Sequence, residues 1–201
     1  MSQARPTPHV AVIGGGLSGA ACAAGLMRRG WRVTVFDKSR GVGGRLATRR
    51  VELPGATTLS FDHGCPFVAP RDPGFRALWA EAVRAGDAAP WRPRIFADLP
   101  MSFDGVVYVP QPGMPQFARR LLEGASLMLG NPVQTLRRGR GGWQVVDADG
   151  RAAGPFDQVV LALPPRQAAP LVGPAHAAGA DALAAIRMEP CWSLMAATDD
   201  V

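Results

Sequence analysis

The feature that most constrains the fold of this chain is a cluster of glycines between two segments of different character. Gly14-Gly15-Gly16-Leu17-Ser18-Gly19 fits the pattern GxGxxG. The apolar run His9–Ile13 before it is typical of a fully buried strand. The residues from Leu17 to Arg29 are mostly small or favour a helix, and Gly30 stands where a helix C-cap belongs. The sequence therefore predicts a strand, a tight glycine turn and a helix.

A second strand follows directly. Residues 31–36 alternate into another buried strand, which ends at Asp37. A strand, a glycine turn, a helix and a strand within about 30 residues form a βαβ unit, whose strands are parallel and whose crossover is right-handed. We therefore expect an α/β fold with a Rossmann-like domain built on a parallel sheet.

Each part of the glycine cluster has an expected role in binding a dinucleotide. Gly14 allows the tight turn, Gly16 lets the backbone approach a pyrophosphate, and Gly19 lets the helix pack closely on the strand. Leu17 and Ser18 open the helix, whose N-terminal N–H groups attract phosphate. The alternative is a turn that only packs glycines. We favour binding, because the helix and both strands occur at the spacing that the motif requires.

The residues around the end of the second strand extend this predicted site. Asp37 stands where the motif places the partner of the ribose hydroxyls, and Lys38 follows it. An acidic residue here disfavours the 2′-phosphate of NADP. It does not distinguish FAD from NAD as the bound dinucleotide. Gly43-Gly44-Arg45 predicts a further pyrophosphate contact, since glycine backbone and a guanidinium both bind phosphate.

The stretch Phe36–Arg50, FDKSRGVGGRLATRR, is very similar to the corresponding segment of bacterial renalase-like proteins, which belong to the wider flavin amine oxidase group. The similarity continues in shorter segments: Phe61-Asp62-His63-Gly64, Arg71-Asp72-Pro73 with Phe75-Arg76, Gly113-Met114 and Glu189-Pro190-Cys191-Trp192. The resemblance implies non-covalent FAD on the glycine cluster, with Asp37 on the ribose and Arg45 near the pyrophosphate. It further implies that the backbone of Val133 meets the adenine and that Gly64 lies beside the isoalloxazine ring.

What the resemblance implies about activity is the oxidation of a small reduced substrate. Renalase-like enzymes oxidise dihydronicotinamide isomers and pass the electrons to O2, which gives H2O2. Three alternatives stay open: amine oxidation, a truncated nucleotide-binding remnant without turnover, and an NAD-dependent dehydrogenase. No catalytic base is assigned. Cys65-Pro66-Phe67-Val68 departs from the family's usual Ala-Gln-Tyr-Phe, and the family's chains are longer, so we expect a C-terminal part to be lacking.

The resemblance and the pattern of elements together predict two interleaved domains. The FAD-binding domain is expected to comprise residues 1–70 and 112–164, and an incomplete α+β substrate domain residues 71–111 and 165–201. Several further elements are predicted: a helix capped by Asp72 and ending at Gly86, a helix over 114–122, hairpins over 101–109 and 142–151, and a strand over 156–163.

The charge and cysteine content exclude several classes of protein. The net charge is +6 and the pI about 10.5, but the arginines are scattered and aromatic residues are only 7%, so we expect no nucleic-acid partner. The three cysteines contain no CxxC pair, which argues against a disulfide framework and a metal site and favours the reducing cytoplasm. No apolar run approaches the ~20 residues of a membrane span. Small-molecule partners are expected: a reduced nicotinamide isomer or an amine, and O2.

Overall fold

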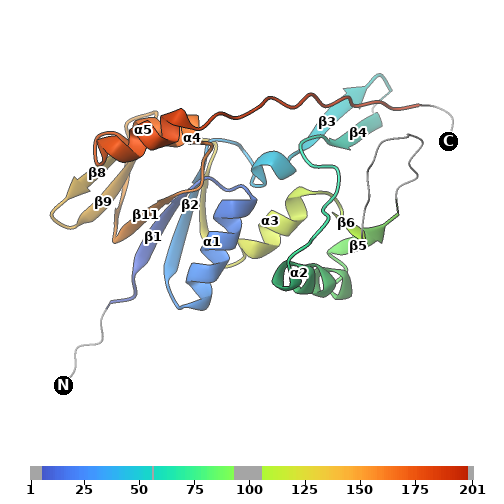
Figure 1. Ribbon diagram of the computed structural model, residues 1–201, viewed down its shortest axis with the longest axis horizontal. Coiled ribbons are helices and arrows are strands. Elements are labelled where there is room, and N and C mark those ends of the chain that lie inside the picture. Colours follow the sequence, from blue (N-terminus) through green and yellow to red (C-terminus); the bar gives the residue numbers. More distant parts are fainter. Residues whose placement is uncertain (1–5, 56, 93–105, 199–201) are drawn as a thin grey trace. The chain divides into compact units, whose positions relative to one another are not determined.

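The computed structural model describes residues 6–55, 57–92 and 106–198 (Figure 1). The chain divides into two compact units. The first unit comprises residues 1–44 and 118–191, and the second comprises residues 45–117 and 192–201. Each unit is described by itself below. The domain boundaries expected from the sequence stay a prediction.

The first unit is built on a parallel sheet. It contains β1 (His9–Ile13), β2 (Arg32–Asp37), β7 (Ser126–Leu129) and β11 (Gln158–Leu161), in the order β11-β1-β2-β7. All three strand pairs are parallel. The chain adds β2 and β7 on one side of β1 and then returns to place β11 on the other side. Ligands of such sheets bind at the carboxyl end of the strand where the order reverses, which here is the end of β1.

One face of this sheet is covered by α1 (Leu17–Arg28), which packs against β1 and β2. The buried residues of the helix are all small: Gly19, Ala20, Ala23 and Ala24. Small side chains let the helix axis come close to the strands, so the contact depends on backbone proximity. The helix ends as predicted, because Gly30 adopts φ +78° just after the cap.

The other face meets a three-stranded antiparallel sheet of β8 (Val133–Gly139), β9 (Gly142–Asp147) and β10 (Ala152–Phe156). The core between the sheets joins apolar side chains from both and from one helix: Ala11, Ile13, Phe36, Val145, Phe156 and Leu171. Leu171 belongs to α4 (Pro165–Val172), which is followed by α5 (Ala177–Ala185). The parallel sheet is therefore the middle layer of three.

The second unit contains two antiparallel strand pairs. They are β3 (Thr48–Leu53) with β4 (Thr57–Asp62), and β5 (Ala88–Trp91) with β6 (Val107–Pro110). A short 3-10 turn, η1 (Gly44–Leu46), precedes β3.

The helices of the second unit pack through aromatic rings. They are α2 (Pro73–Arg84) and the start of α3 (Pro115–Leu121), which runs on into the first unit. Trp79 is fully buried and stacks on Phe117, with ring centroids 4.3 Å apart, while the ring of Tyr108 lies 5.8 Å away on stacked planes. Ring stacking therefore forms the centre of this core.

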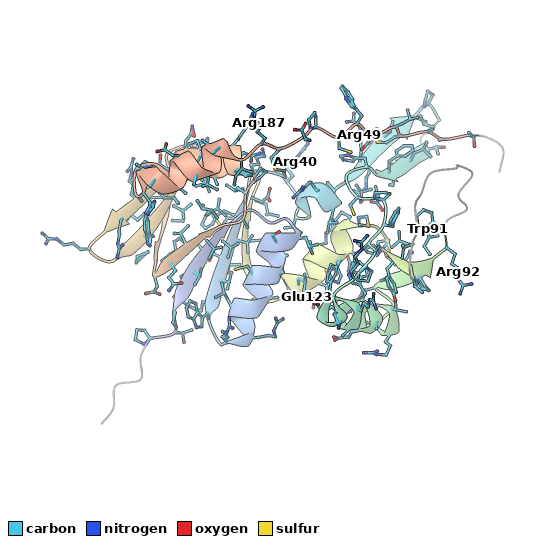
Figure 2. The ribbon with its side chains drawn as sticks, viewed as in Figure 1. Arg40, Arg49, Trp91, Arg92, Glu123 and Arg187 are labelled. Atoms are coloured by element: carbon cyan, nitrogen blue, oxygen red, sulfur yellow. The ribbon has the colours of Figure 1, made fainter. Side chains whose placement is uncertain are left out.

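Exposed arginines occur in both units. Figure 2 labels Arg40 and Arg187 in the first unit and Arg49 and Arg92 in the second. The positive charge is thus distributed over the surface of each unit.

The predicted βαβ unit is confirmed, with β1 at the expected residues and α1 and β2 within one residue of the expected ends. The helices at Asp72 and Met114 and the hairpin around Asp149-Gly150 are also confirmed, although the second hairpin strand begins only at Ala152. The glycine- and arginine-rich stretch from Ser39 to Arg50 has no regular periodicity and predicts a loop, which is wrong at residues 48–50, because they belong to β3. The turn of the hairpin predicted for residues 101–109 lies outside the described residues.

Candidate cofactor-binding site

Gly14 makes the turn at the carboxyl end of β1. Its N–H donates to the carbonyl of Phe36 at 2.8 Å, and its φ of +110° is one that other residues rarely adopt. A Cβ at this position would lie 2.5 Å from the carbonyl oxygen of Ala162, which follows β11. The close packing of three chain segments therefore requires glycine here, as expected for the tight turn.

Gly19 and Gly16 differ in what surrounds them. A Cβ on Gly19 would lie 1.9 Å from the carbonyl oxygen of Gly14, so this glycine lets α1 pack on the turn as predicted. A Cβ on Gly16 would meet nothing nearer than Gly44 Cα at 3.8 Å, and its φ of −72° suits any residue. The protein's own packing leaves room beside Gly16, which is where the motif brings a pyrophosphate.

Asp37 is tied directly to the glycine turn. Its Oδ2 accepts from the N–H of Gly15 at 2.7 Å, and its Oδ1 accepts from the N–H of Ser39 at 2.8 Å. A carboxylate oxygen accepts more than one hydrogen bond, so each oxygen keeps a lone pair for a hydroxyl of a ligand. The end of β2 and the turn after β1 are thus held at a fixed spacing.

Gly15 is a site residue that the sequence reasoning missed, because GxGxxG treats this position as variable. A Cβ there would lie 3.2 Å from both Asp37 Oδ2 and Val42 Cγ1, so a side chain would crowd the carboxylate. The signal in the sequence is the run of three consecutive glycines, of which Gly15 is the second.

The second glycine pair lies on the first. The N–H of Gly43 donates to the carbonyl of Gly15 at 2.8 Å, and Gly43 pairs with Gly16 in a parallel bridge. A Cβ on Gly44 would lie 3.1 Å from Gly16 Cα, and Gly44 has φ +56°. The two glycine segments predicted to share a pyrophosphate therefore lie side by side, whereas their contact with phosphate stays a prediction.

The predicted residues Lys38 and Val133 also belong to the first unit. Lys38 is exposed, and its Nζ donates to Gln167 Oε1 of α4 at 3.3 Å. Val133 begins β8 and is half-buried against the core of this unit. Three residues before it, the N–H of Gly130 donates to the carbonyls of Asp37 and Ser39. The connection from β7 to β8 therefore touches the end of β2.

Arg45 and Gly64, the other two predicted residues, belong to the second unit. Arg45 is exposed on η1, and a Cβ on Gly64 would lie 2.3 Å from its carbonyl oxygen. The neighbouring Cys65 donates its thiol hydrogen to the carbonyl of Phe67 at 3.0 Å. Burial raises the pKa of the Cys65 thiol, which keeps it protonated at neutral pH. The segment after Asp62 is thus packed backbone to backbone on η1.

The first unit fits the phosphates of a dinucleotide. The first turn of α1 contains no acidic residue, so nothing there offsets the partial positive charge of the helix N-terminus. The carboxylate of Asp37 stands one hydrogen bond from the glycine turn. Backbone donors of the kind that bind phosphates and an acceptor of the kind that binds ribose hydroxyls therefore lie on one edge of one sheet.

Metal sites and membrane-spanning helices can be considered for residues 6–55, 57–92 and 106–198. Within these ranges no group of three or more His, Cys, Asp or Glu residues is arranged to hold a metal ion. In the same ranges no helix combines the length and apolar character needed to cross a membrane.

Two family models match the chain. The NAD(P)-binding Rossmann-like domain matches residues 12–82, and the flavin containing amine oxidoreductase matches residues 98–198, half of the chain.

Two curated relatives match short stretches. The carotenoid phi-ring synthase of Streptomyces griseus is 46% identical over 57 residues, which are 28% of this chain and 11% of that protein. A tRNA 5-methylaminomethyl-2-thiouridine biosynthesis bifunctional protein of Delftia acidovorans is 38% identical over 73 residues, which are 36% of this chain and 10% of that protein. The chain therefore spans about a tenth of these two relatives.

Solved structures share the fold over most of the chain. Putrescine oxidase bound to putrescine aligns with a TM-score of 0.57 and 18% identity, covering 83% of this chain and 60% of that chain. A proposed protoporphyrinogen oxidase from Exiguobacterium sp. 255-15 aligns with a TM-score of 0.59 and 12% identity, covering 89% and 64%. At these identities the likeness shows the fold, and the chain spans about three-fifths of each structure.

Proposed function

Because the chain belongs to the flavin containing amine oxidoreductases, whose cofactor is FAD, we propose that it is part of a renalase-like FAD-dependent oxidoreductase. In this proposal the substrate is a small reduced molecule, a dihydronicotinamide isomer, and the electron acceptor is O2. The product of the acceptor is H2O2.

The observation that carries the proposal is the bond between Gly15 N–H and Asp37 Oδ2 at 2.7 Å. It fixes the carboxylate expected on the ribose beside the glycines expected on the pyrophosphate. Gly43 adds a second glycine segment to the same turn. An NAD-dependent dehydrogenase explains this second segment less well, because its chain leads from the second strand directly into another strand–helix unit.

The chain's own residues bind and orient the cofactor in this proposal. Bound FAD supplies the ring that accepts a hydride from the substrate. Overall, one dihydronicotinamide, one O2 and one proton give one oxidised nicotinamide and one H2O2. The glycine turn and Asp37 would hold the pyrophosphate and the ribose, the backbone of Val133 would bind the adenine, and Gly64 would contribute to binding the flavin. We assign no residue to proton transfer.

Amine oxidation is a second candidate, favoured by the family model and by the putrescine in one solved relative. Both candidates use the same cofactor and the same acceptor. They differ in the substrate that reduces the flavin, so one experiment separates them.

The first test is the visible absorption spectrum of the purified protein after incubation with FAD and desalting. Retained bands near ~370 and ~450 nm, the usual flavin signature, support the proposal. Gly16→Ala is the sharpest variant, because its Cβ clashes with nothing in the protein but occupies the side expected to face the pyrophosphate. We expect it to fold normally and to lose the bands. Gly25→Ala in the same helix, with Arg28 Nη2 3.9 Å away, is the matched control and should keep them.

The second test adds substrates to the FAD-loaded protein under nitrogen. Bleaching of the ~450 nm band by NADH isomers reduced at ring positions other than C4, followed by H2O2 formation in air, supports the renalase-like activity. Bleaching by putrescine alone would replace it with amine oxidation. A wild-type protein that stays colourless would contradict the proposal for this chain and favour a remnant that does not hold FAD.

A further inference from the structure

The connection between β7 and β8 is held at the carboxyl end of β2 by backbone hydrogen bonds. The N–H of Gly130 donates to the carbonyl of Asp37 at 3.0 Å and to the carbonyl of Ser39 at 2.9 Å. Gly130 has φ +83°, a left-handed conformation that favours glycine. A shift of this connection would therefore move the backbone from which the Asp37 carboxylate projects.

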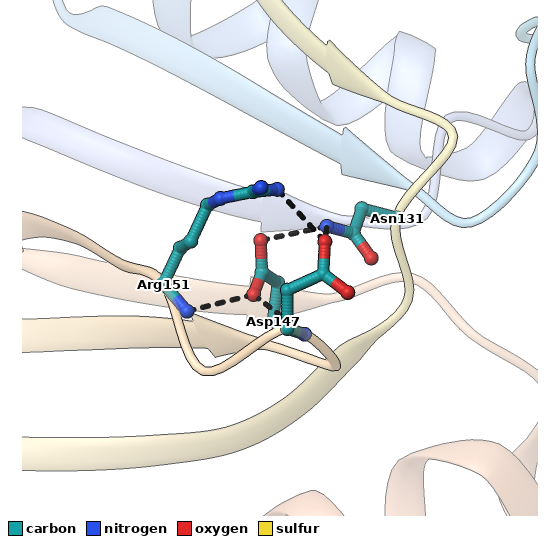
Figure 3. Close-up of polar contacts among 4 residues, drawn as sticks. Asn131, Asp147 and Arg151 are labelled. Atoms are coloured by element: carbon teal, nitrogen blue, oxygen red, sulfur yellow. Dashed lines mark hydrogen bonds and ion pairs between the residues drawn. The ribbon is translucent and has the colours of Figure 1, made fainter.

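Asn131, the next residue, is held by two carboxylates of the turn between β9 and β10 (Figure 3). Its Nδ2 donates to Asp147 Oδ2 at 2.7 Å and to Asp149 Oδ2 at 3.1 Å. The carbonyl of Pro132 in turn accepts from the N–H of Ala148 at 3.0 Å. The β9–β10 turn thus holds both the side chain and the backbone of the connection.

Asp147 makes the central contacts of this network. Its Oδ1 accepts from the N–H of Asp149 at 3.0 Å and from the N–H of Arg151 at 2.8 Å, which shapes the turn. Its Oδ2 holds Asn131, and a hydrogen bond to a charged acceptor is stronger than a neutral one. Arg151 also pairs with Asp149 at 2.7 Å, but the two side chains are 76% and 56% exposed. Such an exposed ion pair stabilises a fold very little.

We propose that Asp147 is a positioning residue for the adenosine half of the dinucleotide. Through Asn131 it fixes the connection that contacts the end of β2, and thereby it fixes the place of the Asp37 carboxylate. The inference rests on the proposed function, because it needs a dinucleotide whose ribose Asp37 binds. Asp147 would then help to determine the affinity for the dinucleotide, although it lies far in sequence from both glycine segments.

The test is Asp147→Asn, which places an amide where Asn131 needs an acceptor. We expect the Kd for ADP and the Kd for FAD to rise by the same factor of about ten, as for a lost charge-assisted hydrogen bond. The factors should be equal because the flavin end of the site is untouched. Hydrogen exchange of the Gly130 N–H should become faster, while the Tm of the ligand-free protein changes little.

Two further variants separate positioning from a general loss of stability. Asp72→Ala removes the cap of α2 in the second unit, so it should lower Tm without changing the Kd for ADP. Combining Asn131→Asp with Asp147→Asn exchanges donor and acceptor, provided that both are made in an Asp149→Asn background, because Asp149 Oδ2 also accepts from Asn131 and would repel a carboxylate at position 131. The double variant should regain at least half of the lost affinity, because one hydrogen bond of the network is restored.

The outcomes distinguish this inference from the proposed function. If the wild type binds neither ADP nor FAD, both are overturned. If the wild type binds and Asp147→Asn binds equally well, only the inference is overturned. It is also overturned if Asp147→Asn lowers Tm as much as Asp72→Ala does while the double variant recovers no affinity, since that pattern indicates a structural role alone.

Discussion

The two units differ in how a helix packs on its neighbours. In the first unit, small residues bring backbones together, so that Gly19 packs on the carbonyl of Gly14 and Gly14 packs on Ala162. In the second unit, large rings fill volume, with Trp79 stacked on Phe117 and near Tyr108. The difference accords with the binding site proposed for the first unit. A site made of backbone N–H groups requires chain segments whose backbones approach one another closely. A core without such a site requires only side chains that fill its volume.

The largest expected effect lies in the second unit. Trp79→Ala removes the central ring of the aromatic core and leaves a cavity, so we expect the free energy of unfolding to fall by about 4 kcal/mol. Trp79→Phe is the matched control, because it keeps a ring in the stack. It also removes the indole N–H, a buried donor for which the described residues provide no hydrogen-bond partner. Urea unfolding followed by near-UV circular dichroism measures both.

This difference between the units would be contradicted if Trp79→Phe lowered the free energy of unfolding as much as Trp79→Ala does. In that case the indole, rather than the volume of the ring, would determine the stability of the second unit.

The next largest effect lies in the first unit, where one methyl group should suffice. Gly19→Ala places a Cβ 1.9 Å from the carbonyl oxygen of Gly14, so we expect a loss of roughly 3 kcal/mol in unfolding free energy. Gly25→Ala, in the same helix, places its Cβ in ordinary contact with Arg28 Nη2 at 3.9 Å and should instead stabilise by about 1 kcal/mol through helix propensity. Urea unfolding by circular dichroism compares them. Equal stabilities of the two variants would contradict the role of close backbone packing.

The sequence predicted the first unit better than the second, and the reason is the distance along the chain between partners. β1, α1 and β2 are neighbours in sequence, and GxGxxG fixes how they join. The pairing of β1 with β11 joins residues far apart, and no local pattern indicates which strand lies next to which. The contact of Gly15 with Asp37 could be found only once both strands were placed.

In the second unit the local signals were weaker. Thr48-Arg49-Arg50 begins β3, but these residues follow a glycine-rich segment, and the strand forms through its pairing with β4. The first unit also contains a helix for which the sequence analysis predicted no element, since α5 lies in an alanine-rich stretch without a clear periodic pattern. His176 Nδ1 accepts from the N–H of Gly179 and caps that helix, a role that histidine rarely signals in sequence.

A third prediction compares the beginnings of α1 and α2. Asp72 closes the start of α2 by accepting from the N–H of Phe75 at 2.9 Å, whereas Gly16 at the start of α1 has no side chain to do so. Asp72→Ala should therefore cost about 1 kcal/mol in unfolding free energy, measured by thermal unfolding. Gly16→Ala adds no cap and should change stability less. A larger loss of unfolding free energy for Gly16→Ala would show that other parts of the protein already fill the space at the start of α1. That result would contradict the proposed binding of phosphate there.

The smallest effect is a dependence of the first unit's stability on pH. His9, at the amino end of β1, contacts Thr34 Oγ1 through Nε2 at 2.9 Å, and its ring lies 4.7 Å from that of Phe156. Burial and then the charge of Arg32 lower the pKa of His9 below its ordinary 6.5, and Asp157 opposes this only in part.

The sign of the effect follows from where the proton binds. The unfolded chain takes up a proton on His9 at a higher pH than the folded chain does, so protonation favours unfolding. The contribution of the neutral ring to stability is therefore complete above pH 6.5 and is lost as the pH falls through the lowered pKa. His9→Gln keeps a side chain that can bond Thr34 but cannot be protonated. We expect unfolding free energies measured between pH 8 and pH 5 to fall less steeply in this variant, and an unchanged slope would show that other groups cause the pH dependence.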